Sequence, residues 1–541
     1  MPEVPTIRRR AALAATFALA TLAGLPARAL ATKTLTWGKE ADVDGMDVQV
    51  TDTVASWELY QLVYETLLTT DKDMALRPGL AESWKQLTPT RYTLTLRAGA
   101  RWSNGRAVVA DDVVGSLQRL DGQEMNPAGV AAARTDADRK KASNRIESSW
   151  ALQLGEIKAL RALDDRTVQV DLAKPHTAFL AALAHITAAI LPMKEFRDGS
   201  FDPTRRLLGS GPFMVAEYKP RERWTLVRNP YYWRTGFPKA DRLVVSILPD
   251  EASRLAALRD GRIDFSMFSN PDIGRLIGND RRLVVGRQET TNYFRMDLNA
   301  VSPKSPFNDK RVRQAADLAI DRQAIADLVF AGTARPDTPV PRAFGKTACQ
   351  DLDTVRLPRA ARLDKARQLM AATGRKRVAI EIVASTGDPV FARIAQVVQQ
   401  NLREVGIDAK ILQLPVAEAL DKVFTRGDFD ANLSWLAGYS DPAMVVAWWN
   451  PKFAVWNAAF QAYVPALADS LETLKAAPAG APRDEQLASV CRQIADTANI
   501  LPLVSKVDFV VHRADRMDIR LDPVTGSSNA FQYIAEFAPR P

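Results

Sequence analysis

The residues that could do chemistry in this chain fall into motifs that lack a necessary member. Gly345-Lys346-Thr347 matches the end of a phosphate-binding loop, but Val340 stands where the first glycine belongs, and the prolines flanking it oppose a strand entering the loop. Gly438-Tyr439-Ser440 matches the start of a nucleophile elbow, but Pro442 replaces its last glycine. We interpret the first segment as a turn and expect no hydrolase serine in the second.

Histidine and cysteine are too sparse for a metal centre. His176, His185 and His512 form no i, i+4 pair and no cluster with cysteine, so we interpret them as structural residues. The two cysteines are Cys349 and Cys491. In an oxidising compartment we expect a disulfide between them, worth about 5 kcal/mol by the chain-entropy argument, and two buried free thiols are the alternative. Without a triad, a metal set or a cofactor loop, we expect no enzyme, no metal and no cofactor.

Length and charge bound the class of protein. A chain of 541 residues, 47% apolar and 25% charged, can bury more than one core, so we expect two or three domains. The net charge of +9 is mild for this length, and the basic clusters at residues 139–141 and 375–377 contain no interleaved aromatic residue. A nucleic-acid surface is therefore not expected.

Residues 1–31 have the pattern of an export signal. Arg8-Arg9-Arg10 precede an apolar run over residues 11–25, and Ala29-Leu30-Ala31 offers a cleavage site. The run is shorter than the roughly 20 residues that span a bilayer. We expect cleavage near Ala31 and ordinary Sec secretion, with twin-arginine export as the alternative that the paired arginines permit. Because no cysteine lies near the cleavage site, we expect a free periplasmic protein rather than a lipid-anchored one.

The elements that must position these residues alternate strands with helices. Residues 243–247 and 378–383 have strand-like patterns, and each is followed by a helix-like segment, at residues 252–258 and 390–405. This alternation predicts a mixed α/β architecture.

Residues 79–117 form one predicted strand, turn and helix unit. Apolar and threonine residues alternate over residues 92–96, which is typical of a half-buried strand. Ser103-Asn104-Gly105 predicts a turn, and Asp111 or Asp112 can cap the helix that follows.

This unit resembles the signature of the peptide- and nickel-type solute-binding proteins of ABC importers, which are family 5 of the extracytoplasmic solute-binding proteins. Further segments resemble the same family in its order: residues 63–70 as a helix leaving the ligand cleft, 163–179 as a strand of the small domain, 209–233, and 292–332. The resemblance implies an α/β, periplasmic-binding-protein-like two-lobe fold of class II type with an additional small domain.

The family layout also implies domain boundaries. After the signal peptide (1–31), lobe I is expected to be discontinuous, a small accessory domain to pack on it, and lobe II to follow. The expected ranges are 32–66, 201–297 and 500–541 for lobe I, 67–200 for the small domain and 298–499 for lobe II. The polar residues 121–149 read as a surface insertion in the small domain.

Residues 431–449 resemble the family's cleft turn. Its first aspartate commonly pairs with the α-ammonium of a bound peptide, and Gly438 occupies that position here. A buried ammonium without a partner is costly, so ordinary peptide binding is in doubt unless Asp52, Asp441 or another acid substitutes. The alternative interpretation of Asp441 is a residue that precedes Pro442 and caps the next helix.

Aromatic residues around this turn have two interpretations, as cleft walls or as core. They are Trp435, Tyr439, Trp448 and Trp449, of which Trp435 matches the family's aromatic residue most closely. On the opposite lobe, residues 51–53 resemble a ligand-contacting loop, and a helix N-cap is the equal alternative. The predicted ligand-binding residues are Thr51, Asp52, Thr53, Trp435, Gly438, Tyr439, Ser440 and Asp441.

The function that the resemblance implies is solute capture. A monomeric receptor would close two lobes over a peptide, a peptide-like compound or another small organic solute, and deliver it to an inner-membrane ABC permease. The family architecture binds many ligand classes, so the ligand stays open. A ligand-presenting or chaperone-like receptor is one alternative, which neighbouring permease and ATPase genes would argue against, and an enzyme is the other.

Overall fold

The computed structural model describes residues 33–51, 53–71, 73–123, 125, 135, 145–148, 150–344, 349–519, 524–525 and 534–540. The predicted signal segment, Asp52, most of the polar stretch 121–149 and the Gly345-Lys346-Thr347 motif lie outside these residues. Our interpretations of those four features therefore stay predictions.

One mixed sheet of eleven strands runs through the described chain. Its order is β14-β13-β15-β12-β16-β11-β1-β10-β9-β8, and β18 pairs with β12. The bounds are β1 Thr34–Lys39, β8 Phe213–Lys219, β9 Arg223–Arg228, β10 Arg242–Ile247, β11 Phe265–Phe268, β12 Leu283–Leu298, β13 Val378–Ser385, β14 Ile407–Leu414, β15 Ala431–Leu436, β16 Ile500–Arg513 and β18 Val524–Thr525.

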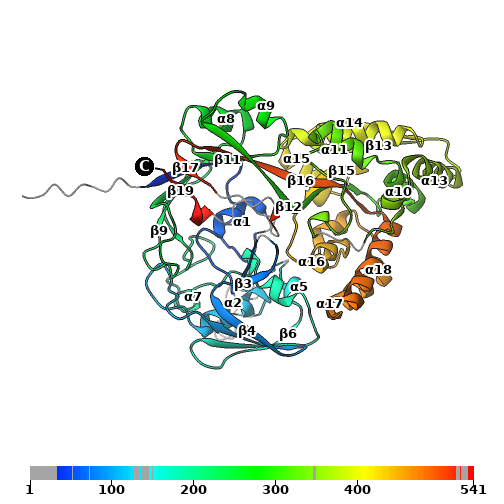
Figure 1. Ribbon diagram of the computed structural model, residues 1–541. Coiled ribbons are helices and arrows are strands. Elements are labelled where there is room, and N and C mark those ends of the chain that lie inside the picture. The colour runs from blue at the N-terminus through cyan, green and yellow to red at the C-terminus, as the bar shows by residue number, and fades with distance from the viewer. Residues whose placement is uncertain are drawn as a thin grey trace, which may run out of the picture. The chain divides into compact units, whose positions relative to one another are not determined.

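The two long strands β12 and β16 join the two ends of this sheet. They pair antiparallel along most of their length, and Figure 1 shows them side by side. Beyond β12 lie β15, β13 and β14, and beyond β16 lie β11, β1 and the strands β10 to β8. The antiparallel pair β12 and β16 therefore lies between two groups of parallel strands. In the first group β13 pairs with β14 and β15, and in the second β1 pairs with β10 and β11.

A second, antiparallel sheet and two short ribbons complete the strands that the structure describes. The second sheet has the order β4-β5-β7-β6. The bounds are β2 Leu68–Thr70, β3 Leu76–Pro78, β4 Ala81–Thr88, β5 Arg91–Leu96, β6 Ile157–Ala162, β7 Thr167–Leu172, β17 Met517–Asp518 and β19 Ala538–Pro539. The strand expected over residues 92–96 is confirmed as β5.

Some helices, such as α8, α10, α11, α14 and α16, begin at an aspartate whose side chain caps them. In α10, Asp309 accepts a hydrogen bond from the Arg311 N–H (2.9 Å), and Val312, Ala315 and Ala319 are buried. The bounds are α1 Val54–Tyr60, α2 Ala110–Leu120, α5 Ala151–Leu154, α6 Phe179–Ala182, α7 Met193–Arg197, α8 Glu251–Arg259, α9 Ile273–Ile277, α10 Lys310–Ala319, α11 Arg322–Phe330, α12 Asp353–Arg356, α13 Arg359–Ala372, α14 Pro389–Arg403, α15 Val416–Leu420, α16 Pro442–Val446, α17 Pro465–Ala476 and α18 Ala481–Thr497. None of the helices in the described ranges is long and apolar enough to cross a membrane.

The start of α2 shows how the strand, turn and helix unit closes. The carboxylate of Asp112 accepts a hydrogen bond from the Val109 N–H (3.1 Å) and one from the Trp102 ring N–H (3.2 Å). Arg106 from the turn forms an ion pair with the same carboxylate (2.8 Å). Asp112 therefore caps the helix and ties the turn to it.

The helix expected over residues 63–70 is wrong. Helix α1 ends at Tyr60, and the Leu62 and Val63 carbonyls accept hydrogen bonds from Phe213 (2.9 Å) and Gly211 (2.8 Å). A Cβ atom at Gly209 would lie 1.9 Å from the Val63 oxygen, so the two segments touch through their backbones. The carbonyls that a helix needs are used by a distant segment, and the chain continues into β2.

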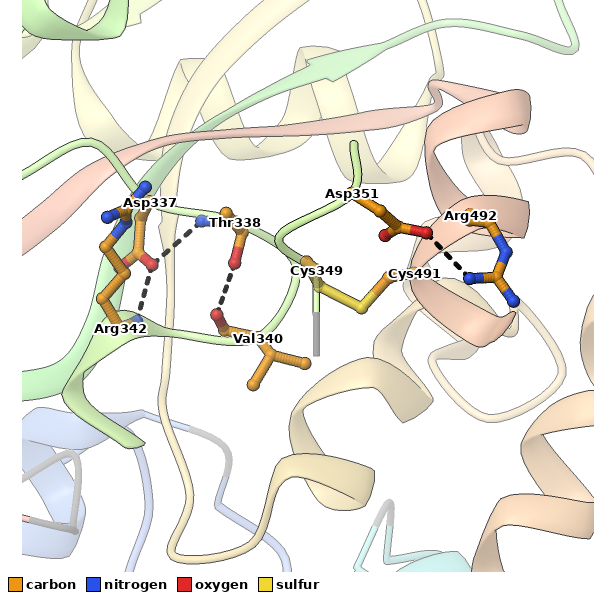
Figure 2. The surroundings of a disulfide bond; sticks show 8 residues. All are labelled: Asp337, Thr338, Val340, Arg342, Cys349, Asp351, Cys491 and Arg492. Carbon is orange, nitrogen blue, oxygen red and sulfur yellow. Dashed lines mark hydrogen bonds and ion pairs between the residues drawn. A yellow bond between two sulfur atoms is a disulfide. The ribbon is translucent and has the colours of Figure 1, made fainter. Parts of the chain in front are cut away.

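Cys349 and Cys491 form a disulfide across 142 residues, with their Cα atoms 5.4 Å apart. Figure 2 shows that the bond joins the segment before α12 to α18, and that an ion pair between Asp351 and Arg492 (2.8 Å) lies beside it. Both cysteines belong to a buried apolar cluster that extends from Trp102 to Trp449.

Candidate ligand-binding site

Gly438 follows β15 in a position that has no room for a side chain. A Cβ atom there would lie 2.0 Å from the Thr291 Oγ1 atom and 2.3 Å from the Thr291 carbonyl carbon. The Gly438 N–H donates a hydrogen bond to the Asn292 side-chain oxygen (2.6 Å). The backbone of β12 therefore fills the space in which the family's aspartate would begin.

Asp441 is a helix cap. Its Oδ1 atom accepts a hydrogen bond from the Ala443 N–H (2.8 Å) at the start of α16, and it pairs with Arg483 (2.6 Å) from α18. Ser440 lies half-buried just before it. The structure thus has the capping role that we gave as the alternative for Asp441, and the carboxylate already has a cationic partner.

Tyr439 belongs to a group of contacting rings that we call the aromatic cluster: Trp57, Trp150, His185, Tyr439 and Trp448. The ring centroids of Trp150 and His185 are 3.9 Å apart in a stacked pair, and Tyr439 lies 5.3 Å from Trp150 and 5.6 Å from His185. Trp57 meets His185 edge-on at 4.5 Å, and Tyr439 stacks on Trp448 at 6.1 Å. Segments far apart in the sequence therefore meet through uncharged rings.

Burial keeps the aromatic cluster neutral. It lowers the pKa of His185 to about 3, and the Nδ1 atom of this ring accepts a hydrogen bond from the Thr187 N–H (3.2 Å). His176 is likewise structural, because its Nε2 atom lies 2.9 Å from the Gln153 carbonyl oxygen and burial lowers its pKa to about 4. In the described ranges, no three His, Cys, Asp or Glu residues are placed to hold a metal ion.

The loop before α1 is joined to the aromatic cluster. The Trp57 ring N–H donates a hydrogen bond to the buried Thr51 carbonyl oxygen (3.0 Å). Thr53 caps α1, since its hydroxyl oxygen accepts a hydrogen bond from the Ser56 N–H (3.4 Å). The capping interpretation of this loop therefore holds for Thr53, and Asp52 lies outside the described residues.

Trp435 lies in β15 opposite Phe294 of β12 and is partly buried. Part of its ring packs on the apolar core around α10, α13 and α14. The Lys506 ammonium lies 5.5 Å from the ring centroid, within reach of a cation–π contact. The core interpretation therefore holds for part of the Trp435 ring, and the wall interpretation stays a prediction.

Lys506 opens a second group, which we call the charged cluster: Lys39, Glu58, Lys506 and Asp508. Lys39 forms an ion pair with Glu58, and Lys506 forms one with Asp508. All four side chains are buried, Glu58 completely. Buried charges are costly unless they are paired, so each of these lysines fixes the position of its acid.

Burial shifts the titration of this cluster. It raises the pKa of Glu58 to about 7, against the opposing charge of Lys39. Burial lowers the pKa of Lys506, but Asp508, Asp388 and Glu58 outweigh it and the net direction is upward. Because Glu58 is on α1 and Lys506 is beside Trp435, the charged cluster connects the two predicted faces of the site.

The sequence analysis missed the charged cluster. Its members come from β1, α1 and β16, and nothing local joins residues 39, 58 and 506. One signal was present: Lys506 and Asp508 stand two apart in a strand that is otherwise largely apolar, which places two charges on one buried face. Trp150 was missed for the same reason, because its partners His185 and Tyr439 are distant in sequence.

Comparisons with known proteins concern the family and the fold. Residues 75–456 match the family described as bacterial extracellular solute-binding proteins, family 5 middle. The dipeptide-binding protein of Escherichia coli K12 is 28% identical over 76% of this chain and 77% of its own. Two solved structures share the fold: NikZ of Campylobacter jejuni in complex with Ni(L-His) (TM-score 0.78, 19% identity, 94% and 99% coverage) and DppA of Helicobacter pylori in complex with the peptide STSA (TM-score 0.77, 21% identity, 94% and 98% coverage).

Proposed function

The chain belongs to the bacterial extracellular solute-binding proteins of family 5 and is a solute-binding receptor of an ABC importer, and on this premise we propose that its ligand is a small organic solute without a free peptide amino terminus. The observation that carries the ligand proposal is the contact between Gly438 and Thr291. A ligand ammonium at this turn has no carboxylate in position 438, and the backbone of β12 leaves no space for one.

The acids that the structure describes at the candidate site and in the charged cluster are already engaged, and Asp52 lies outside the described residues. Asp441 is held by Arg483 and by the start of α16, Glu58 by Lys39 and Asp508 by Lys506. Recruiting one of them to a ligand ammonium would separate an existing pair and take a partner from a buried lysine, Lys39 or Lys506, or from the partly buried Arg483, which is expensive. A neutral, anionic or differently presented ligand avoids this cost.

The proposed contacts come from both faces of the site. Trp435 and Tyr439 would enclose the ligand from one lobe, and residues 51–53 would contact it from the other. Lobe II would comprise residues 298–499, and hinge closure against lobe I and the small domain would bury the ligand. A micromolar dissociation constant needs about 8 kcal/mol, which a few hydrogen bonds and ring contacts in a desolvated site supply.

The same premise supports a periplasmic monomer that hands its ligand to inner-membrane permease subunits without changing it. The relatives named above are binding proteins, and residues 1–31 have the pattern of an export signal. We propose neither turnover nor nucleic-acid binding. Retention of the processed protein in membranes after a salt wash would contradict the free periplasmic state, and hydrolysis of a peptide or ester that survives repurification would contradict the absence of turnover.

Native mass spectrometry of protein purified without denaturation tests the receptor directly. We expect one added mass of a small organic solute, present in stoichiometric amount and released when the protein is unfolded. Unfolding and refolding in its absence should give a protein that rebinds the isolated solute. Loss of the solute's mass only together with the appearance of a product would instead indicate an enzyme.

A further inference from the structure

A polar cavity of about 190 Å³ lies apart from the aromatic and charged clusters, between the start of α11, residues 336–342 and the helices α12 and α13. Three arginines line it: Arg322 in α11, Arg362 in α13 and Arg342 in the short helix η3 (Arg342–Phe344). Because a water molecule takes about 30 Å³ in the liquid, the cavity has space for a small ion with part of its hydration shell.

Arg322 is a structural guanidinium. Its Nε atom donates to the Pro502 carbonyl (2.7 Å), one Nη atom donates to the Asp317 carbonyl (3.1 Å), and the other pairs with the Asp317 carboxylate. The charge of Arg322 is therefore compensated within the protein. A second lining residue, Asp321, is likewise paired, with Arg359 (2.9 Å).

Arg362 has no such compensation. Its side chain is 8% exposed, and one Nη atom donates to the Ile320 and Leu318 carbonyls (2.9 and 3.3 Å). Its Nε atom is buried with no hydrogen-bond partner in the described chain, and no described carboxylate forms an ion pair with it. Burial, together with the charge of Arg322, lowers its pKa, and the nearby carboxylates of Asp321 and Asp317, which pair with Arg359 and Arg322, offset this only in part.

Arg342 meets the protein mainly through its backbone. The backbone N–H donates to the Asp337 carboxylate (2.8 Å), as does the N–H of Thr338 (2.9 Å), and Figure 2 shows these groups together. The Nε atom of Arg342 is buried without a partner among the described residues. Burial raises the pKa of Asp337 to about 7, so this acid compensates the guanidinium only in part near neutral pH.

The wall opposite these arginines is held in place covalently. Thr354, Val355 and Leu357 line the cavity from the segment that follows Cys349, and the disulfide to Cys491 anchors this segment to α18. The cavity is therefore a formed site, with walls from α11, α12 and α13, rather than a gap between mobile side chains.

We propose that this cavity binds a small oxyanion through the guanidinium groups of Arg342 and Arg362, with the Thr354 hydroxyl as a further donor. The planar fork of arginine matches the oxygens of phosphate and carboxylate, and charge-assisted hydrogen bonds of this kind are roughly twice as strong as neutral ones. Such an anion would complete the counter-charge that Asp337, Asp321 and Asp317 supply only in part. Phosphate, sulfate and carboxylate share this chemistry.

Isothermal titration with inorganic phosphate, sulfate and acetate, each against sodium chloride of equal ionic strength, tests the proposal. We expect saturable binding of phosphate and sulfate, and binding of acetate as well would extend the site to carboxylates. Arg342→Gln should weaken phosphate binding by about tenfold or more, because a charge-assisted pair is lost. The matched control is Arg356→Gln in α12, which is 57% exposed, pairs with Asp353 and does not line the cavity. The affinity of the Arg356→Gln variant for phosphate should equal that of the parent protein.

A second readout separates binding from general charge screening. In the parent protein labelled with ¹⁵N-arginine, the Nε–H signals of Arg342 and Arg362 are assigned as those that change in the Arg342→Gln and Arg362→Lys variants. Addition of phosphate should shift these two signals and leave the Arg356 signal in place. Absence of saturable binding by all three anions would overturn the proposal. Equal losses of affinity in Arg342→Gln and Arg356→Gln would overturn it too.

Discussion

The aromatic cluster and the charged cluster both join the first 200 residues to the last 250, and they do so by opposite means. The aromatic cluster is uncharged at neutral pH, and rings such as Trp150 and Tyr439 hold it by contact area. The charged cluster holds its two lysines and two acids in buried ion pairs, with Glu40 also paired to Lys39 (3.2 Å), and burial raises the pKa of Glu58 to about 7. Dispersion is insensitive to salt and pH, whereas buried pairs respond to any added charge. Both clusters therefore respond to pH, through His185 and Glu58, but only the charged cluster is held by ion pairs.

The largest expected effect concerns the disulfide behind the aromatic cluster. Cys491→Ala should lower the free energy of unfolding by up to about 5 kcal/mol, because the bond closes a long loop in the unfolded chain. Chemical denaturation measures the change. The control is the parent protein after reduction of the disulfide, which should unfold at the same denaturant concentration as the variant. Two alkylatable thiols in protein from the periplasm would contradict the bond itself.

Gly438 lies in the sequence between Trp435, which is near Lys506 of the charged cluster, and Tyr439, which belongs to the aromatic cluster. Gly438→Ala should destabilise the protein by about 3 kcal/mol, because the new methyl group would overlap the Thr291 backbone. Gly274→Ala is the matched control, since a Cβ atom there meets nothing within 4 Å. It should change the unfolding free energy little. Equal stability of Gly438→Ala and the parent protein would show that β12 does yield at this point.

The Trp435 ring lies within cation–π reach of Lys506 in the charged cluster. Trp435→Ala should weaken binding of the natural ligand by about 1 to 3 kcal/mol if the ring is a wall of the site. A ring that serves the core alone would lower the unfolding free energy and leave the affinity of the folded fraction unchanged. Titration calorimetry and thermal unfolding of the same sample separate the two outcomes, and Trp435→Phe serves as the conservative control.

The smallest effect, taken per pH unit, is the pH dependence of stability, and it has opposite signs in the two clusters. His185 has a folded pKa of about 3, below its ordinary 6.5, so its contribution is complete above pH 6.5 and is lost as pH falls. Glu58 has a folded pKa of about 7, above its ordinary 4.5, so its contribution is complete below pH 4.5 and is lost as pH rises. Each contributes a slope of up to about 1.4 kcal/mol per pH unit between these limits.

Denaturation curves from pH 4.5 to 6.5 can therefore compare the clusters directly. Relative to the parent protein, His185→Gln should make the unfolding free energy rise less with pH, and Glu58→Gln should make it rise more. The absolute stabilities of the variants do not matter for this test, because only the slopes are compared. Changes of the same sign in both variants would end the distinction between the two clusters.

Local patterns predicted the elements, and contacts between distant segments decided the exceptions. The alternation over residues 92–96 and the apolar face of α10 are properties of their own segments, so both were predicted. Residues 63–70 were expected to be helical, but hydrogen bonds from Gly211 and Phe213 take the carbonyls.

The candidate site shows the same division. The sequence alone showed that position 438 has a glycine instead of the family's aspartate. The structural reason is that the Thr291 backbone occupies the space of a side chain there. This contact could not be predicted, because it depends on the pairing of β12 with β15. The cap formed by Asp441 was predictable from Pro442, whereas its partner Arg483 was not, because 42 residues separate them. The charged cluster depends on three elements that meet only in the folded chain.

The most direct test of the central claim is a calorimetric titration of unmodified di- and tripeptides into protein that has been freed of its co-purifying ligand by unfolding and refolding. The same peptides with acetylated amino termini are the control, and the isolated natural solute confirms that the site is competent. The account predicts that unmodified peptides bind more weakly than low micromolar and gain nothing from their free ammonium group. Low-micromolar binding of unmodified dipeptides, lost on acetylation, would contradict it.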